Sequence, residues 1–71
     1  MKIVANDYEE KDIMKIIRQW TELTQKEFGK SINLSKMTIQ SYEIGQRRFS
    51  FETLLRIAHK HNLKITIEKI K

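Results

Sequence analysis

The chain has 71 residues, which is enough for one small domain and too few for an enzyme with a separate cofactor domain. Its 39% hydrophobic and 32% charged residues are typical of a folded globular domain, and the absence of cysteine excludes disulfides and thiolate metal sites. The formal net charge of +5 favours a polyanionic partner, and nucleic acid before a membrane, because no stretch approaches the roughly 18 apolar residues of a membrane span.

The first predicted element is a helix over about residues 8–22. Its apolar side chains recur at intervals of three and four, as one buried helix face requires: Ile13, Ile16, Ile17, Trp20 and Leu23. Asp7, followed by Glu10 three residues later, resembles a capping box, and the acids nearby suit the positive end of the helix dipole. We therefore assign the acidic cluster to helix stability and Trp20 to the core.

Two shorter helices follow, separated by a tight turn. Thr24 can cap the first of them while Glu27 reaches back in a capping box, and this helix ends near residue 32. Asn33 stands at the turn, since it is one of the few residues other than glycine that tolerate a positive φ. Ser35 offers an N-cap for the next helix, which runs to about residue 42. Three apolar side chains should face inward there: Leu34, Ile39 and Tyr42.

A basic loop and a further helix complete the helical part of the chain. Gly45 is placed to end the preceding helix, and a loop with two arginines follows over residues 46–49. Ser50 opens the next helix, which carries apolar residues at helical spacing and ends near His61 or Asn62.

From Lys64 the pattern changes to period two, with isoleucines at 65 and 67 alternating with polar residues. A strand needs a partner, and the β-branched start of the chain is the nearest candidate. We therefore predict short terminal strands over about residues 2–5 and 64–70. They would pair antiparallel within one chain, or the same residues would pair across a dimer.

The expected fold class is mainly α, a compact bundle of four to five short helices with short terminal β-strands. The whole chain, residues 1–71, is expected to form a single domain whose core spans about residues 8–63.

The second and third helices, with the turn between them, have the layout of a helix-turn-helix. They lie in the basic part of the chain: residues 24–71 hold ten basic and four acidic side chains, whereas residues 1–23 hold four and five. More specific features lie in three segments: Leu23–Gly29, Ser41–Arg48 and Leu54–Ala58. On these segments the chain resembles the Cro and phage-repressor (Xre-type) family over about residues 18–63.

The resemblance implies a lambda-repressor-like bundle in which the helix of about residues 35–42 enters the major groove of operator DNA. Most members of that family regulate transcription as dimers. By position, base contacts are implied for four residues: Lys36, Met37, Gln40 and Ser41. Met37 has a second interpretation, in which it shields the core instead of touching a thymine methyl.

The remaining site residues follow from the resemblance together with the basic charges around the motif. Phosphate contacts are expected from six residues: Gln25, Ser35, Arg47, Arg48, Lys26 and Lys30. The resemblance also implies a partly buried ion pair between Arg18 and Glu43.

The chain departs from the family pattern at three positions. Gly29 stands where alanine is usual, and Asn33 stands where glycine is usual, but both keep the physical requirement for a small residue and for a positive φ. Phe49 stands where proline is common. We expect Phe49 and Phe51 to pack beneath the basic loop, whereas an exposed Phe49 would mark a protein interface.

No catalytic or metal site is expected. The hydroxyls of Thr24, Ser35 and Ser50 are explained by helix capping, and no histidine and acid are placed to activate them. His59 and His61 lie on different sides of one helix, so joint metal binding is not expected, and no cofactor is implied.

We interpret the chain as a non-enzymatic, sequence-specific regulator of transcription that binds double-stranded operator DNA as a homodimer, in the manner of a phage or prophage repressor. Its first residues are too short for a signal peptide, so a cytoplasmic protein is expected. The alternative is an antitoxin-like or host-factor-binding module that also binds DNA. RNA binding is a third interpretation, but it normally needs exposed aromatic residues, and most aromatic residues here have a core explanation.

Overall fold

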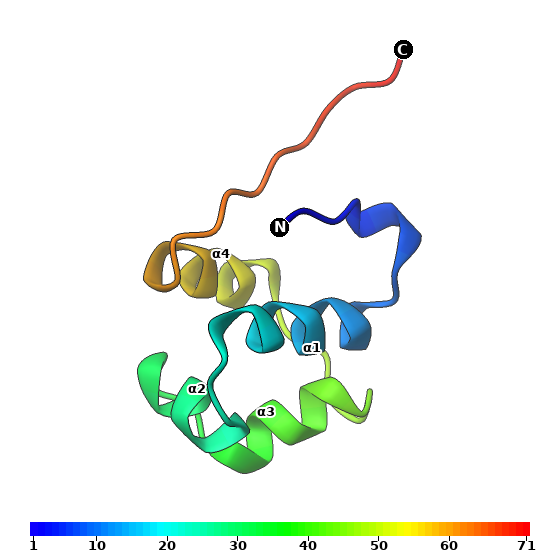
Figure 1. Cartoon of the computed structure of the whole chain (residues 1–71). Helices are drawn as coiled ribbons and strands as arrows, with labels where there is room; N and C mark the ends of the chain where they lie inside the picture. The colour runs from blue at the N-terminus through cyan, green and yellow to red at the C-terminus, as the bar shows by residue number, and fades with distance from the viewer.

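Four α-helices make up the computed structural model, which describes residues 1–71 (Figure 1). They are α1 (Glu10–Thr21), α2 (Gln25–Ser31), α3 (Lys36–Glu43) and α4 (Phe51–Lys60), and a 3-10 turn at Ala5–Asp7 precedes them. In Figure 1, α1 lies in the middle of the molecule, with α4 on one side of it and α2 and α3 on the other. The mainly α fold class predicted from the sequence is therefore confirmed.

Hydroxyl caps set the starts of three helices, as the sequence predicts. Thr24 Oγ1 accepts a hydrogen bond from Glu27 N at 3.1 Å, and Glu27 Oε1 accepts one from Thr24 N at 2.9 Å, which completes a capping box at α2. The hydrogen bond from Thr24 N to the carboxylate, with a smaller effect of the Thr24 side chain, lowers the pKa of Glu27. Ser35 caps α3 through Thr38 N at 3.1 Å, and Ser50 caps α4 in the same way.

The start of α1 differs from the prediction. Its N-cap is Glu9, which makes no side-chain cap bond, so the proposed capping box of Asp7 and Glu10 is wrong. Asp7 instead ends the 3-10 turn, in which Asp7 N donates to Val4 O at 3.0 Å. The acids of the first turn, Glu10 and Asp12, still lie at the positive end of the helix dipole.

One hydrophobic core joins all four helices. It consists of seven buried residues: Met14, Ile17, Phe28, Ile32, Ile39, Tyr42 and Ile57. Leu34 packs against this cluster from the turn between α2 and α3. Trp20 does not belong to it and is only half-buried, so the assignment of Trp20 to the core is wrong. The reason is that the apolar face of α1 is wider than the surface that α2, α3 and α4 cover.

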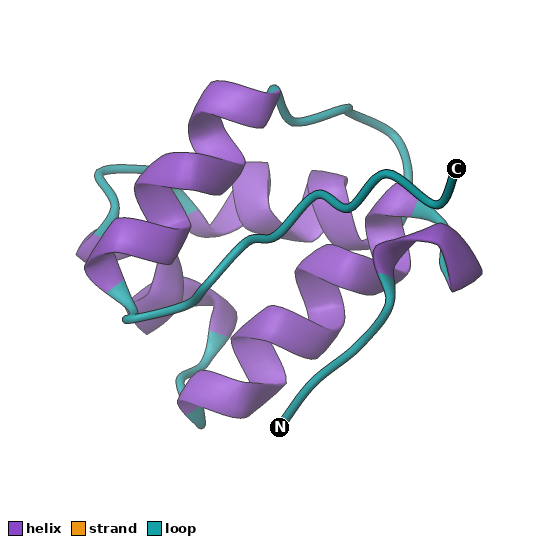
Figure 2. Ribbon diagram, turned by 90° about the horizontal axis from the view of Figure 1, so that it is seen from above, coloured by secondary structure: helices purple, strands orange, loops and turns teal.

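The two ends of the chain contain no strand, and the predicted pairing between residues 2–5 and 64–70 within one chain is wrong. The 3-10 turn redirects the first residues, and the left-handed conformation of Asn62, with φ of 58°, sends the last segment in another direction. Figures 1 and 2 show the two ends diverging, with the last segment extended across the helices when viewed from above. No backbone hydrogen bond joins them.

None of the four helices combines the length and the apolar character that crossing a lipid bilayer requires.

Candidate nucleic-acid interface

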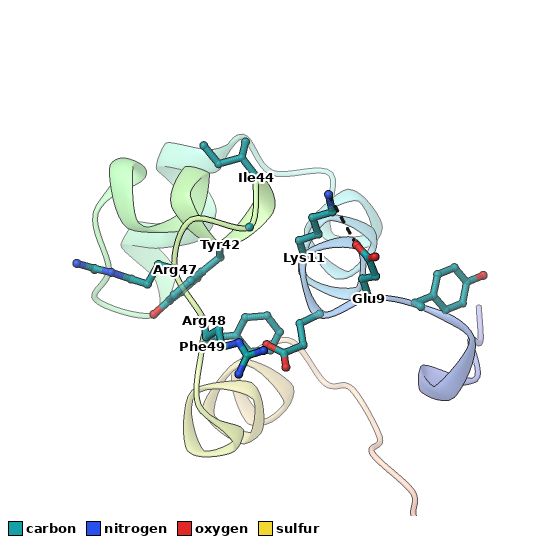
Figure 3. A pocket seen from close by; sticks show the side chains of 10 residues that line it. Glu9, Lys11, Tyr42, Ile44, Arg47, Arg48 and Phe49 are labelled. Atoms are coloured by element: carbon teal, nitrogen blue, oxygen red, sulfur yellow. Dashed lines mark ion pairs between the residues drawn. The ribbon is translucent and has the colours of Figure 1, made fainter.

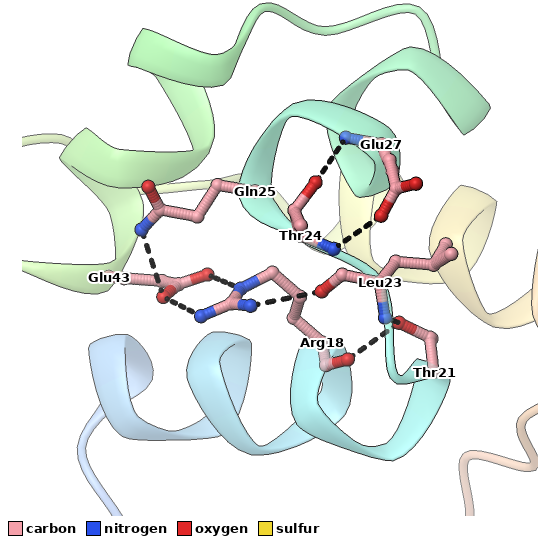
Figure 4. A network of polar contacts seen from close by, with 7 residues as sticks. All are labelled: Arg18, Thr21, Leu23, Thr24, Gln25, Glu27 and Glu43. Carbon is pink, nitrogen blue, oxygen red and sulfur yellow. Dashed lines mark hydrogen bonds and ion pairs between the residues drawn. The ribbon is translucent and has the colours of Figure 1, made fainter.

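A buried ion pair holds the helix-turn-helix against α1 (Figure 4). Arg18 Nε donates to Glu43 Oε2 at 2.6 Å, and Arg18 Nη2 donates to Glu43 Oε1 at 3.0 Å, so the pair is bidentate. The Glu43 side chain is only 2% exposed, and the Arg18 side chain is 18% exposed. The structure thus brings together the two residues that the resemblance pairs, and the hydrogen bonds from Arg18 to Glu43 raise the pKa of Arg18.

Two further groups form hydrogen bonds with the residues of this ion pair. Arg18 Nη1 donates to Leu23 O at 3.0 Å in the turn between α1 and α2. Gln25 Nε2 donates to Glu43 Oε1 at 3.3 Å from the first position of α2. The network therefore fixes α3 relative to both α1 and α2. This use of Gln25 was not predicted, because it depends on the packing of α2 against α3 and leaves no spacing signal in the sequence.

The turn between α2 and α3 passes so close to Gly29 that an alanine at this position would clash with it. Gly29 O accepts hydrogen bonds from Ile32 N at 3.0 Å and from Leu34 N at 2.8 Å. A Cβ atom on Gly29 would lie 2.5 Å from Leu34 O and 3.2 Å from the Ile39 side chain. Asn33 adopts the positive φ that the turn needs, 60°. The close approach of the turn to Gly29 thus fixes the place where α3 begins.

The outer face of α3 carries most of the side chains that the resemblance assigns to bases. Lys36 and Gln40 are exposed, and Met37 is 76% exposed, so Met37 projects into solvent and does not shield the core. Ser41 is half-buried at the edge of this face, while Ile39 and Tyr42 turn inward. The Ser35 hydroxyl, at the helix start, is engaged as the cap of α3 and lies 2.9 Å from Thr38 Oγ1.

The loop after α3 is held against the end of that helix. Gln46 N and Arg47 N both donate to Ser41 O, at 3.0 and 3.2 Å, and Gly45 has a positive φ of 82°. The ring of Phe49 meets the ring of Tyr42 edge to face, with centroids 5.6 Å apart. These contacts fix the place of the loop next to α3.

The two loop arginines point in different directions (Figure 3). Arg47 extends away from α1, whereas Arg48 lies beside Phe49 in a hollow that α1 also lines. That hollow contains charges of both signs, because Glu9 and Lys11 face it and lie 3.7 Å apart. Arg47 also lines this hollow, so both loop arginines border a site with charges of both signs.

The two phenylalanines of this region behave differently. Phe49 is half-buried beneath the loop, as expected, so it does not form an exposed protein interface. Phe51 is exposed, and the expectation that it packs under the loop is wrong. It is the first residue of α4, directly after the Ser50 cap, and it does not pack against the hydrophobic core.

Positive charge around the motif is not neutralised within the chain. The structure contains two ion pairs, Arg18 with Glu43 and Lys11 with Glu9, and neither uses the basic residues assigned to phosphates. Those residues are all exposed: Lys26 and Lys30 on α2, Arg47 and Arg48 in the loop. Unpaired basic side chains on the surface of a small domain produce a positive potential that attracts a polyanion. No group of three or more histidines or acids is placed to hold a metal ion.

A family model described as helix-turn-helix matches residues 14–67 of the chain. Comparisons with curated proteins and with solved structures gave no match. The matched range includes most of α1 and all of α2, α3 and α4. It therefore covers the Arg18–Glu43 network, the tight turn and the exposed face of α3.

Proposed function

Because the chain belongs to the Cro/Xre-type helix-turn-helix family of DNA-binding proteins, we propose that it is a sequence-specific regulator of transcription that acts on double-stranded operator DNA, in the manner of a phage repressor. The observation that carries the proposal is the exposed face of α3, which stands beside unpaired basic side chains and is fixed by a buried ion pair. An α-helix with its side chains is about 10–12 Å in diameter, which fits the major groove, about 12 Å wide, and the eight residues of α3 give about two turns to lie in it.

Each side chain of α3 that is assigned to a base contact has a chemical match at a base edge. Lys36 can donate to guanine O6 and N7, and Gln40 can form the two-point contact that adenine N6 and N7 offer. Met37 can touch a thymine methyl, and the Ser41 hydroxyl can donate to or accept from a neighbouring base. Lys36 and Gln40 lie one helical turn apart, so both can face the groove at once.

Phosphate contacts are proposed from α2 and from the loop after α3, next to the exposed face of α3. Lys26 and Lys30 would contact the backbone from α2, and Arg47 and Arg48 would contact it from the loop. Gln25 uses one amide hydrogen toward Glu43, which leaves the other free for a phosphate. Ser35, at the start of α3, would also contact a phosphate of the DNA backbone. Such contacts set the position of the protein on DNA without reading the sequence.

The proposed assembly is a homodimer in the cytoplasm on an operator with two-fold symmetry. One copy of so small a domain covers little DNA surface, so useful affinity calls for two copies. Their half-sites would lie about one helical turn apart, and occupancy of the operator would exclude or recruit polymerase.

Selection of bound duplexes from random DNA, followed by titration with the preferred site, tests the proposal. Gln40→Ala should lose about 1–3 kcal/mol of discrimination at one base position. Arg47→Ala should weaken binding to all sequences alike and reduce the salt dependence by about one counterion. The matched controls are Gln19→Ala on α1 and Arg56→Ala on α4, two exposed residues outside the motif. Binding without sequence preference at moderate salt, or equal effects of Gln40→Ala and Gln19→Ala, would refute the assignment.

A further inference from the structure

The sulfur atoms of this chain differ sharply in their access to solvent. The sequence contains no cysteine and three methionines, so all of its sulfur is in thioethers. Met14 lies in the hydrophobic core and is 0% exposed, whereas Met37 is 76% exposed and Met1 is 93% exposed. An oxidant dissolved in water therefore reaches Met37 and Met1 but not Met14. Within the four helices, Met37 is the one methionine that is open to oxidation.

Met37 stands on the face of α3 that the proposed function brings to the bases. It is the second residue of that helix, directly after the Ser35 cap and Lys36. Gln40 and Ser41 follow it at intervals of three and four residues, so the three side chains share one side of the helix. Among the four residues assigned to bases, Met37 is the one with an apolar side chain. Any contact with a thymine methyl from this set thus depends on a group that can be oxidised.

We propose that Met37 is an oxidation site and that its redox state sets the DNA affinity of the chain. The oxidant class is a peroxide. In the reaction, a lone pair of the thioether sulfur attacks one oxygen of hydrogen peroxide, an S–O bond forms and the O–O bond breaks. The sulfur is oxidised by two electrons to the sulfoxide, and the peroxide is reduced to one molecule of water. The inference rests on the proposed function, because it concerns the same face of α3.

The sulfoxide changes the polarity of the side chain with little change in its length. Its oxygen is a hydrogen-bond acceptor, and a thymine methyl offers it no donor, so the contact would remove water from a polar group without replacing the hydrogen bond. The proposed phosphate contacts, among them Arg47 and Lys26, keep their charges. Oxidation should therefore weaken binding to the preferred duplex about tenfold and leave binding to unrelated duplexes unchanged.

Oxidation of the full chain by hydrogen peroxide, followed by peptide mass spectrometry, tests the site itself. In the free chain, Met37 and Met1 should be oxidised while Met14 stays reduced, and a reduced Met14 shows that the fold has not opened. The preferred duplex, selected from random DNA, should then slow the oxidation of Met37 and leave that of Met1 unchanged. Met1 is an internal control because it lines a groove with Trp20 and Leu54, on the side of α1 away from α3 (Figure 1).

Titration of the preferred duplex with the oxidised chain tests the effect on binding. Affinity should fall about tenfold. The matched control is Met37→Leu, which keeps an apolar side chain without sulfur, and its affinity should be the same before and after peroxide treatment. A methionine sulfoxide reductase supplied with dithiothreitol should restore the affinity of the oxidised chain, because the dithiol becomes a disulfide and the sulfoxide oxygen leaves as water.

Deoxyuridine, which lacks the methyl group of thymidine, tests the contact. Each thymine of the preferred duplex is replaced by uracil in turn. At the position that Met37 contacts, the replacement should weaken binding of the reduced chain and should shrink the difference between the reduced and oxidised chains. At the other positions that difference should stay about tenfold, since sites that do not touch contribute independently.

Several outcomes contradict the proposal. A sequence-specific chain that binds its preferred duplex equally well before and after oxidation of Met37 overturns this inference alone. The same holds if the duplex fails to protect Met37, or if no uracil replacement changes the effect of oxidation. A reduced chain that binds all duplexes alike overturns the proposed function and this inference with it.

Discussion

Replacing Arg18 by methionine would leave the Glu43 carboxylate buried without a cationic partner. The substitution removes hydrogen bonds of 2.6 and 3.0 Å and leaves only the amide of Gln25, at 3.3 Å, to solvate the charge. It also frees Leu23 O from its bond to the guanidinium. Methionine keeps much of the aliphatic length of arginine, so the change is mainly one of charge and hydrogen bonding.

The expected loss follows from the exposure of the two partners. Breaking a fully buried ion pair costs about 3–5 kcal/mol. Glu43 is 2% exposed but Arg18 is 18% exposed, so the lower end of that range applies, about 3 kcal/mol. A domain of 71 residues has a free energy of unfolding of about 4–10 kcal/mol. The variant should therefore lose a third or more of its stability, and its melting temperature should fall by about 12–24 °C.

Urea denaturation followed by circular dichroism and by the fluorescence of Trp20, the one tryptophan, measures the effect. Lys15→Met is the matched control, because it removes an exposed positive charge from the same helix and should change stability by less than about 0.5 kcal/mol. Arg18→Met combined with Glu43→Leu should recover much of the loss, since no buried charge remains. If Arg18→Met proves too unstable to measure, Glu43→Gln gives a milder test with an expected loss of about 1–2 kcal/mol. A loss below about 1 kcal/mol in Arg18→Met, or no recovery in the double variant, would contradict the reasoning.

Two further predictions concern Gly29 and His61. Gly29→Ala should lower the free energy of unfolding by about 1–2 kcal/mol, because the clash of the new Cβ atom with Leu34 O, 2.5 Å away, outweighs the gain of about 1 kcal/mol in helix propensity. Urea denaturation measures this change. A variant as stable as the unmodified chain, or more stable, would show that the turn moves to accommodate the Cβ atom. His61 stacks on Phe28 and its Nε2 lies 2.8 Å from Ser31 Oγ, and burial, with a smaller effect of Lys60, lowers the pKa of His61 below 6.5. The neutral ring is favoured by folding, so this contribution is complete above the unfolded pKa and is lost as the pH falls from about 6.5 through the folded value. Melting temperatures measured from neutral to mildly acidic pH should show that loss in the unmodified chain and in His59→Gln but not in His61→Gln, and an unaltered pH dependence in His61→Gln would count against it.

Local sequence signals predicted the helices well because their causes are local. Thr24, Ser35 and Ser50 cap the helices that they precede through bonds that span three residues, and Asn33 takes the conformation that its own side chain tolerates. Gly45 ends its helix for the same kind of reason. The resemblance then supplied what no local signal contains, the alignment of these helices with a known motif.

The errors share a different cause. Asp7 has the spacing of a cap, but the chain before α1 folds into its own turn and uses Asp7 there. Trp20 has the spacing of a core residue, but whether a helix face is covered depends on elements far away in the sequence. The period-two pattern after Lys64 indicates a preference for extended structure, but it does not identify the strand that would pair with it. Gln25 joined the ion pair because α2 and α3 pack closely, which no pattern within α2 encodes.

Helix α1 has two faces with different roles in the structure. Arg18 and Trp20 are two residues apart, which is about 200° around the helix. One side of α1 therefore holds the helix-turn-helix, and the other side lines an apolar groove between the two ends of the chain. At the end of α4, the chain is held by the hydrogen bonds from His61 N to Ile57 O and from Leu63 N to Ala58 O, both 2.9 Å. It follows that the base preference proposed for α3 depends on the face of α1 that holds Arg18 and not on the face that holds Trp20.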